Sequence, residues 1–186
     1  MTGFVERARA ERVEVVEYDP DWPVRFEEEA ARLHKLLPEE HLGRIEHIGS
    51  TAVPGLVAKP IVDLAVEVPD LEHVRDEIAP ELACHGYEFF WRPRKDGLPG
   101  IEYAWFIRRD AEGRRTHHVH MLTPGSPYWD RVTFRDWLRT HPGAAREYGE
   151  IKRQAAALHG QDRAAYARAK GRFIRKILDQ AAMSAP

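Results

Sequence analysis

The sequence predicts an α+β fold with a sheet domain over residues 12–123 and a helical segment over residues 126–183. Short β-branched runs bounded by turn residues recur in the first part, which is typical of strands. After residue 126 the chain is rich in Ala, Arg and Leu at helical spacing. A length of 186 residues accommodates one domain with a helical addition and excludes two unrelated enzyme domains.

The sheet domain is expected to contain strands and helices. The elements expected are, in chain order, an extended segment at residues 13–18, a helix ending before Pro38, strands at 44–48 and 61–68, a helix at 70–85, and strands at 87–91, 101–109 and 116–122. Asp70 is the expected N-cap of the second helix, and Pro80 is expected to disturb that helix. Residues 92–100 are expected to form a loop, and residues 110–114 to close a hairpin.

The helical segment is expected to contain three helices, because residues 128–183 keep helical spacing with one interruption at residues 141–143. Residues 129–176 carry twelve Lys and Arg against five Asp and Glu, whereas residues 1–30 carry nine acids against four bases. The basic surplus is either a solvated helical face or a surface for an anionic partner such as a nucleotide phosphate.

Composition narrows the class of protein. With 43% hydrophobic and 31% charged residues, the chain is typical of soluble globular proteins. A single cysteine, Cys84, excludes an internal disulfide and a thiolate metal site. The sequence shows neither a long apolar run nor a secretory signal, so we expect no membrane association and a cytoplasmic location. Nucleic-acid binding is not expected either, because the net charge is −2 and no known reader motif is present.

Residues 47–63 hold the most informative pattern, in which a strand is followed by Gly49 and Ser50, a loop, and a second strand with Asp63. Gly49 lets the backbone approach a phosphate, Ser50 can donate a hydrogen bond to it, and Asp63 can hold a Mg²⁺ ion that bridges phosphates. Two other interpretations stand. The Gly-Ser pair can be a tight turn, and Asp63 can form a structural ion pair with Lys59 or an arginine.

Strand alternation places the polar residues on shared faces. Asp63 and Glu67 lie on one face of their expected strand, and His118 and His120 lie on one face of theirs. Such a histidine pair can bind one metal, contact a phosphate, or act as acid and base near neutral pH, although single histidines are usually structural. Neutral imidazole favours Zn, Mn or Fe over Mg.

Aromatic and basic residues pair in the helical segment. Tyr148 and Lys152 are four residues apart, as are Tyr166 and Lys170, so each pair shares one helix face. With Arg135, these lysines can cover a triphosphate. The alternative is an ordinary amphipathic helix whose lysine stems lie along apolar surface.

Several long motifs are present together. They are the run HIGSTAVPGLVAKPIVD from residue 47, Asp-Pro-Asp-Trp-Pro at residues 19–23, Thr-His-His-Val-His at 116–120, and Phe-Arg-Asp-Trp-Leu-Arg-Thr-His-Pro at 134–142. Over about residues 13–180 the chain is identified by them as a member of the GrpB family, which resembles the nucleotidyltransferase fold of the polymerase-β superfamily. The resemblance implies a nucleotidyltransferase-like mixed β-sheet with helices on one face and a C-terminal helical segment packed on the core. The family also occurs fused to dephospho-coenzyme A kinase, which points to nucleotide or coenzyme metabolism.

The resemblance matches Gly49 and Ser50 to the Gly-Ser loop of nucleotidyltransferases and Asp63 to their first carboxylate. The superfamily pattern has a second carboxylate two residues later, where this chain has Ala65, and Glu67 lies one repeat further along. Two-metal nucleotidyl transfer needs carboxylates that hold metals about 3.5–4 Å apart. Asp63 alone cannot do this, so either other residues complete a rearranged site or the protein binds its ligand without transferring a group.

The hypothesis that these residues favour is transfer of a nucleotidyl group from a nucleoside triphosphate to a small-molecule or protein acceptor, with a divalent metal that is Mg or Mn, or else Zn. The expected catalytic residues are Asp63, His118 and His120. The expected metal ligands are Asp63, Glu67, His118 and His120, with Glu102 as a further member of a rearranged site. The expected phosphate-binding residues are Gly49, Ser50, Lys59, Arg135, Lys152 and Lys170. The alternatives are a non-catalytic module that binds a nucleotide or phosphorylated metabolite, and a metal-dependent phosphohydrolase that uses the histidine pair.

Overall fold

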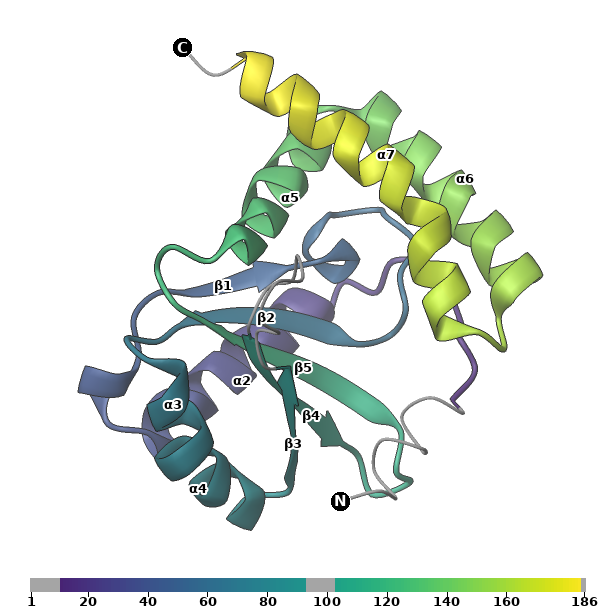
Figure 1. Ribbon diagram of the computed structural model, residues 1–186. Helices are drawn as coiled ribbons and strands as arrows, with labels where there is room; N and C mark the ends of the chain where they lie inside the picture. The colour runs from purple at the N-terminus through teal and green to yellow at the C-terminus, as the bar shows by residue number, and fades with distance from the viewer. Residues whose placement is uncertain (1–10, 93–102, 185–186) are drawn as a thin grey trace.

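The computed structural model describes residues 11–92 and 103–184, which are arranged around a five-stranded mixed sheet (Figure 1). The strands, in spatial order, are β1 (Ile45–Ile48), β2 (Val62–Glu67), β5 (Arg115–Leu122), β4 (Tyr103–Arg109) and β3 (Tyr87–Arg92). β2 and β5 run parallel, while the other three neighbouring pairs are antiparallel. The α+β class is confirmed, and each predicted strand is present with small differences at its ends.

One face of the sheet carries the main hydrophobic core. Leu64 of β2, Phe106 of β4 and Val119 of β5 are fully buried there. The helices that contribute to this core are α2 (Trp22–Leu36), α3 (Leu71–His73) and α4 (Ala79–Cys84). Because strand residues alternate between faces, the residues next to Leu64 and Val119 point to the opposite face, where the polar side chains gather.

The predicted helix at residues 70–85 is divided by a π-helical turn at Val74–Ile78. As predicted, Asp70 is the N-cap, because its side chain accepts hydrogen bonds from the backbone N–H groups of Glu72 and His73. Pro80 lies in the first turn of α4, directly after the π-helical turn. Since proline has no N–H to donate and its ring crowds the preceding turn, it explains why the regular helix is interrupted here.

The three predicted C-terminal helices are present. They are α5 (Asp130–Thr140), α6 (Pro142–His159) and α7 (Arg163–Ser184). They enclose a second core, in which Leu138, Tyr148 and Phe173 pack against Val53 and Leu56 of the loop that precedes β2. Figure 1 shows α6 and α7 side by side, with α5 leading toward them from the sheet. The loop therefore links the sheet to the helical segment.

The segment before α2 contacts both the loop that precedes β2 and the helical segment. Val16 forms an antiparallel bridge with Ala58, and the Val13 N–H donates to Gly160 O at 2.7 Å. The predicted loop at residues 92–100 and the candidate ligand Glu102 fall almost entirely outside the described residues. In the described ranges, none of the helices combines the length and the apolar character that crossing a bilayer requires.

Candidate functional site

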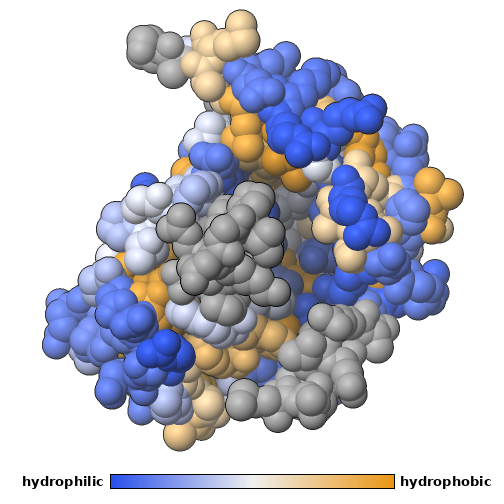
Figure 2. All heavy atoms as spheres, viewed as in Figure 1, coloured by the Kyte–Doolittle hydropathy of each residue, from blue (hydrophilic) through white to orange (hydrophobic). Residues whose placement is uncertain are grey.

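A cavity of about 200 Å³ lies between the polar face of the sheet and the helical segment. Figure 2 shows the surface hollowed between these two parts of the molecule. The described residues that line the cavity are Ile48, Gly49, Ser50, Thr51, Ala58, Lys59, Ile61, Asp63, His118, His120, Tyr128, Arg131, Tyr148, Lys152, Tyr166 and Lys170. Most of the predicted site residues are among them.

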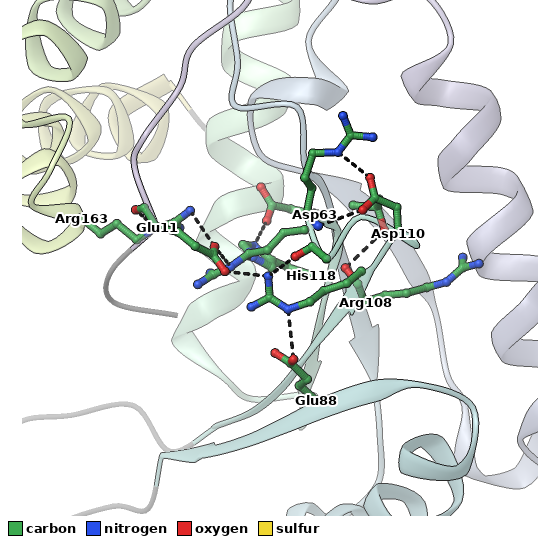
Figure 3. Close-up of polar contacts among 12 residues, drawn as sticks. Glu11, Asp63, Glu88, Arg108, Asp110, His118 and Arg163 are labelled. Atoms are coloured by element: carbon green, nitrogen blue, oxygen red, sulfur yellow. Dashed lines mark hydrogen bonds and ion pairs between the residues drawn. The ribbon is translucent and has the colours of Figure 1, made fainter. Parts of the chain in front are cut away.

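The parallel pairing of β2 with β5 brings one carboxylate and two imidazoles together. Asp63 pairs with His118 in the strand register, and His120 lies two residues further along the same face of β5. Asp63 Oδ1 is 2.9 Å from His118 Nδ1 (Figure 3), and it is 3.8 Å from His120 Nε2. One ligand atom from each residue lies within 4.8 Å of the others, and no other such cluster of His, Cys, Asp and Glu was found among the described residues. This donor set fits a divalent metal ion.

The protonation states of the three residues suit metal binding. Burial lowers the pKa of His118 to about 3 and also lowers the pKa of His120, so both imidazoles are neutral near pH 7. Burial on its own would raise the pKa of Asp63, but the hydrogen bond with His118 and the nearby His120 ring hold that pKa well below its usual range. An ionised carboxylate beside neutral imidazoles is the form that a metal requires. In addition, His120 Nδ1 is buried and has no hydrogen-bond partner in the described part of the chain.

Gly49 stands directly against Asp63. Its φ is +74°, and a Cβ built on it would lie 2.6 Å from Asp63 Oδ2. A larger residue would therefore meet both a steric clash and an unfavourable backbone conformation. Ser50 begins the 3₁₀ turn Ser50–Ala52 immediately after this glycine and lines the cavity. The predicted proximity of Gly49, Ser50 and Asp63 is present.

Four basic side chains line the same cavity as this carboxylate. They are Lys59, Arg131, Lys152 and Lys170, and Asp63 is the one acidic side chain among the described residues that line the cavity. Burial lowers the pKa of Lys59 to about 8 and that of Lys170 to about 7. Burial and the neighbouring lysines hold the pKa of Lys152 well below its usual range, and Lys152 Nζ donates to Val57 O. The cavity therefore has an excess of positive charge that an anion would compensate.

A second cavity of about 290 Å³ adjoins the first and is more apolar. The two cavities share Gly49, Ser50, Tyr128, Arg131 and Tyr148. The other residues that line the second cavity are Pro127, Asp130, Phe134, Leu138, Ile174 and Leu178. A charged cavity thus opens beside an aromatic and aliphatic one.

Two predicted site residues have other partners. Arg135 Nη1 donates to Glu46 Oε2 at 2.7 Å and to His47 O at 2.8 Å, so its guanidinium joins α5 to β1 and does not line the cavity. Glu67 Oε2 accepts from Arg44 Nε at 3.1 Å, beyond the cavity lining. Both side chains are held in ion pairs outside the cavity lining, so the arrangement of the described residues does not support phosphate binding by Arg135 or metal binding by Glu67, and these roles stay predictions.

The lining residues that were not predicted as site residues include Tyr128, Arg131 and Tyr166. Arg131 and Tyr128 follow closely after β5, and the Arg131 guanidinium lies 4.1 Å from the centre of the Tyr128 ring. The Tyr166 hydroxyl is buried and has no hydrogen-bond partner in the described ranges. Two features of the sequence point to these residues. Tyr166 lies four residues before Lys170, and Tyr128 and Arg131 follow closely after the strand that carries the histidines.

Comparison with known proteins gives consistent results. A family model described as "GrpB protein" matches residues 12–180. A UPF0157 protein of Pseudomonas aeruginosa is 41% identical over 174 residues, which cover 92% of this chain and 68% of that protein. The UPF0157 protein YqkA of Bacillus subtilis is 36% identical over 172 residues, but these make up only 47% of its length.

The fold of the chain is similar to that of a solved relative. The crystal structure of the conserved protein GrpB from Enterococcus faecalis aligns with a TM-score of 0.74 at 39% identity, covering 90% of this chain and 96% of that one. The structure of Cid1 in complex with its short product ApU is a distant likeness, with a TM-score of 0.44 at 15% identity over 81% of this chain.

Proposed function

The chain belongs to the GrpB family, and from that membership we propose that it binds the phosphate groups of a nucleotide together with a divalent metal ion in the cavity beside Asp63. The observation that carries this proposal is the convergence of Lys59, Arg131, Lys152 and Lys170 on a site with one carboxylate.

The charge balance supports an anionic ligand with several negative charges. Three lysines and an arginine repel one another, and this repulsion contributes to the low pKa values of Lys152 and Lys170. A polyphosphate would accept hydrogen bonds from these groups and restore their charged forms. Ser50 and the backbone after Gly49 would add neutral donors on the sheet side of the cavity.

The metal would be held within the cluster of Asp63, His118 and His120. When bound, a divalent ion would neutralise phosphate charge and polarise a phosphoryl oxygen. The mixed nitrogen and oxygen donor set favours Mn or Zn over Mg. Because the cavity is already positively charged, we expect metal and polyphosphate to bind more tightly together than either binds alone.

The adjoining cavity supports a nucleotide rather than an inorganic polyphosphate. Phe134 lines this cavity with its aromatic ring, and Tyr148 lines both cavities. Stacking of a base on an aromatic side chain contributes about 1–3 kcal/mol. A base would lie in the apolar cavity while its phosphates lie among the lysines.

Transfer of the nucleotidyl group to a small-molecule or protein acceptor is a second candidate. It is favoured by the contact of Gly49 with Asp63, which would bring a phosphate against the metal-binding carboxylate. One observation argues against transfer. The described residues that line the cavity include one carboxylate, whereas two-metal nucleotidyl transfer uses more than one. We therefore place binding before transfer.

Isothermal titration calorimetry tests the proposal. The full chain is titrated with each nucleoside triphosphate and with tripolyphosphate, with Mn²⁺ present and absent. We expect at least one nucleoside triphosphate to bind more tightly than tripolyphosphate, and Mn²⁺ to increase its affinity. Equal or absent binding of all these anions would contradict the proposal. Release of pyrophosphate on addition of candidate acceptors would support transfer.

A further inference from the structure

We infer that Arg115 fixes His118 as a hydrogen-bond donor to Asp63, so that His118 positions this carboxylate while Asp63 and His120 hold the metal. The assignment of metal ligands rests on the proposed function. The proton position on His118 does not, because it follows from contacts within the chain.

His118 lies between two groups of opposite hydrogen-bonding character. Its Nδ1 atom is 2.9 Å from Asp63 Oδ1, and its Nε2 atom is 3.4 Å from Arg115 Nη1. All three side chains come from the paired strands β2 and β5. Both ring nitrogens of His118 are therefore already engaged.

The chemistry of arginine decides which nitrogen carries the proton. A guanidinium group only donates hydrogen bonds, so Nε2 must accept and present its lone pair to Arg115. In a neutral imidazole the proton is then on Nδ1, where it is donated to the Asp63 carboxylate. The other tautomer would set two N–H donors against each other and leave Asp63 Oδ1 facing a lone pair.

This arrangement is unfavourable for metal binding by His118. A metal needs an imidazole lone pair. In the inferred tautomer the Nδ1 lone pair is replaced by a proton, and the Nε2 lone pair faces a cation. His120 differs, because its Nδ1 atom is buried without a partner in the described residues and its Nε2 atom lies 3.8 Å from Asp63 Oδ1.

Arg115 is itself held in place. Its Nε atom is 2.5 Å from Glu11 Oε2. Glu11 also contacts Arg109 Nη1 at 2.6 Å and Arg163 Nη2 at 3.4 Å, so it joins β4, β5 and the start of α7. Figure 3 shows Glu11 beside Arg163. With its side chain only 4% exposed, Arg115 has little freedom to turn away from His118.

The first test needs no metal. Long-range ¹H–¹⁵N correlation spectra of the metal-free protein report which imidazole nitrogen of His118 carries the proton, with His118→Asn used to assign its signals. We expect the Nδ1–H form in the wild type and a mixture of tautomers in Arg115→Met. An Nε2–H form in the wild type would overturn the inference, whatever ligand the cavity binds.

The second test separates positioning from ligation through Mn²⁺ affinity measured by electron paramagnetic resonance. His118→Asn places an amide N–H where Nδ1–H stood but offers no ring lone pair, so we expect affinity within about threefold of the wild type. His118→Ala should lose about 10- to 100-fold, the range typical when a group that orients a ligand is removed. His120→Asn is the matched change at the inferred ligand and should lose more than His118→Ala.

Equal losses in His118→Asn and His120→Asn would show that His118 is a ligand and overturn the inference. A wild type that binds no Mn²⁺ or Zn²⁺ would contradict the metal assignment and the proposed function together, while the spectra would still decide the tautomer. Circular dichroism of each variant separates a loss of folding from a loss of binding.

Discussion

Asp63 and His118 occupy facing positions in the parallel strands β2 and β5, and their side chains meet with Asp63 Oδ1 2.9 Å from His118 Nδ1. Two segments more than fifty residues apart in the chain thereby form one site. The pair lies where the backbone at Gly49 and the lysines of α6 and α7 also converge.

Gly49→Ala should disturb the site as well as the backbone. With φ +74° and ψ −168°, Gly49 has a conformation that is essentially restricted to glycine and costs a residue with a Cβ on the order of 1–3 kcal/mol, and here the new Cβ would also clash with Asp63 Oδ2 at 2.6 Å. The matched control is Gly55→Ala, because Gly55 has φ +75° but nothing within 4 Å of an added Cβ. Chemical unfolding should show a loss in both variants, whereas metal binding should weaken only in Gly49→Ala. Equal metal affinity in the two variants would argue against the close contact with Asp63.

Lys170 should make the stability of the ligand-free protein depend on pH. Burial lowers its pKa from 10.5 to about 7 in the folded state. Between these values the unfolded chain binds a proton that the folded chain does not, so this group makes stability rise with pH from about 7 to about 10.

Urea unfolding at pH 7 and pH 9 measures the effect of Lys170. Lys170→Met should be more stable than the wild type at pH 7. Its free energy of unfolding should rise less between pH 7 and pH 9 than that of the wild type. It should also bind tripolyphosphate more weakly. Lys176→Met is the control on the same helix, because the Lys176 side chain is 56% exposed. If Lys170→Met lowered stability at pH 7, the proposed cost of burying this lysine would be wrong.

Arg135→Met should reduce stability without a direct effect on phosphate binding. The substitution removes hydrogen bonds to Glu46 and His47 O and leaves Glu46 without this ion pair. Hydrogen bonds to charged groups contribute about 1.5–3 kcal/mol each, and we expect a loss of about 2–3 kcal/mol in the free energy of unfolding. Calorimetry at a temperature where the variant is folded should give wild-type affinity for the triphosphate. A tenfold loss of affinity in the folded variant would restore Arg135 to the binding site.

Phe134→Leu should weaken the preference for nucleotides. Loss of stacking on one aromatic ring corresponds to about 1–3 kcal/mol, so we expect a nucleoside triphosphate to lose about fivefold or more in affinity while tripolyphosphate is unchanged. Trp137→Leu changes an aromatic residue of α5 that lines neither cavity and serves as the control. Parallel losses for both ligands would place Phe134 in the support of the helix and not in a base site.

The core of the site could be predicted because strand alternation is a local rule. A period of two is enough to place Asp63 on one face of its strand and His118 with His120 on one face of another. The sequence does not specify that these strands are parallel neighbours, since pairing depends on the whole topology. The prediction therefore identified the residues but not the Asp63–His118 hydrogen bond.

Contacts between residues far apart in the chain could not be predicted from local patterns. Helical spacing relates Arg135 to other residues of its own helix, but it does not reveal that Glu46 of β1 lies within reach. Arg115 and Glu11 were missed for the same reason, because they meet across more than one hundred residues of chain. Lys152 and Lys170 do line the cavity, and each lies four residues after a tyrosine whose ring its ammonium group faces, while their role in phosphate binding stays a prediction.

The most direct measurement of the central claim is the thermal unfolding midpoint of the full chain with a nucleoside triphosphate and Mn²⁺, for the wild type, Asp63→Asn and Glu67→Gln. At ligand concentrations about 100 times Kd, binding adds about 2.7 kcal/mol, which corresponds to a rise of roughly 5–10 °C for a chain of this size. We predict this rise in the wild type and in Glu67→Gln, and loss of its Mn²⁺-dependent part in Asp63→Asn. No rise with any triphosphate at millimolar concentration, or the same Mn²⁺-dependent rise in Asp63→Asn, would contradict the account.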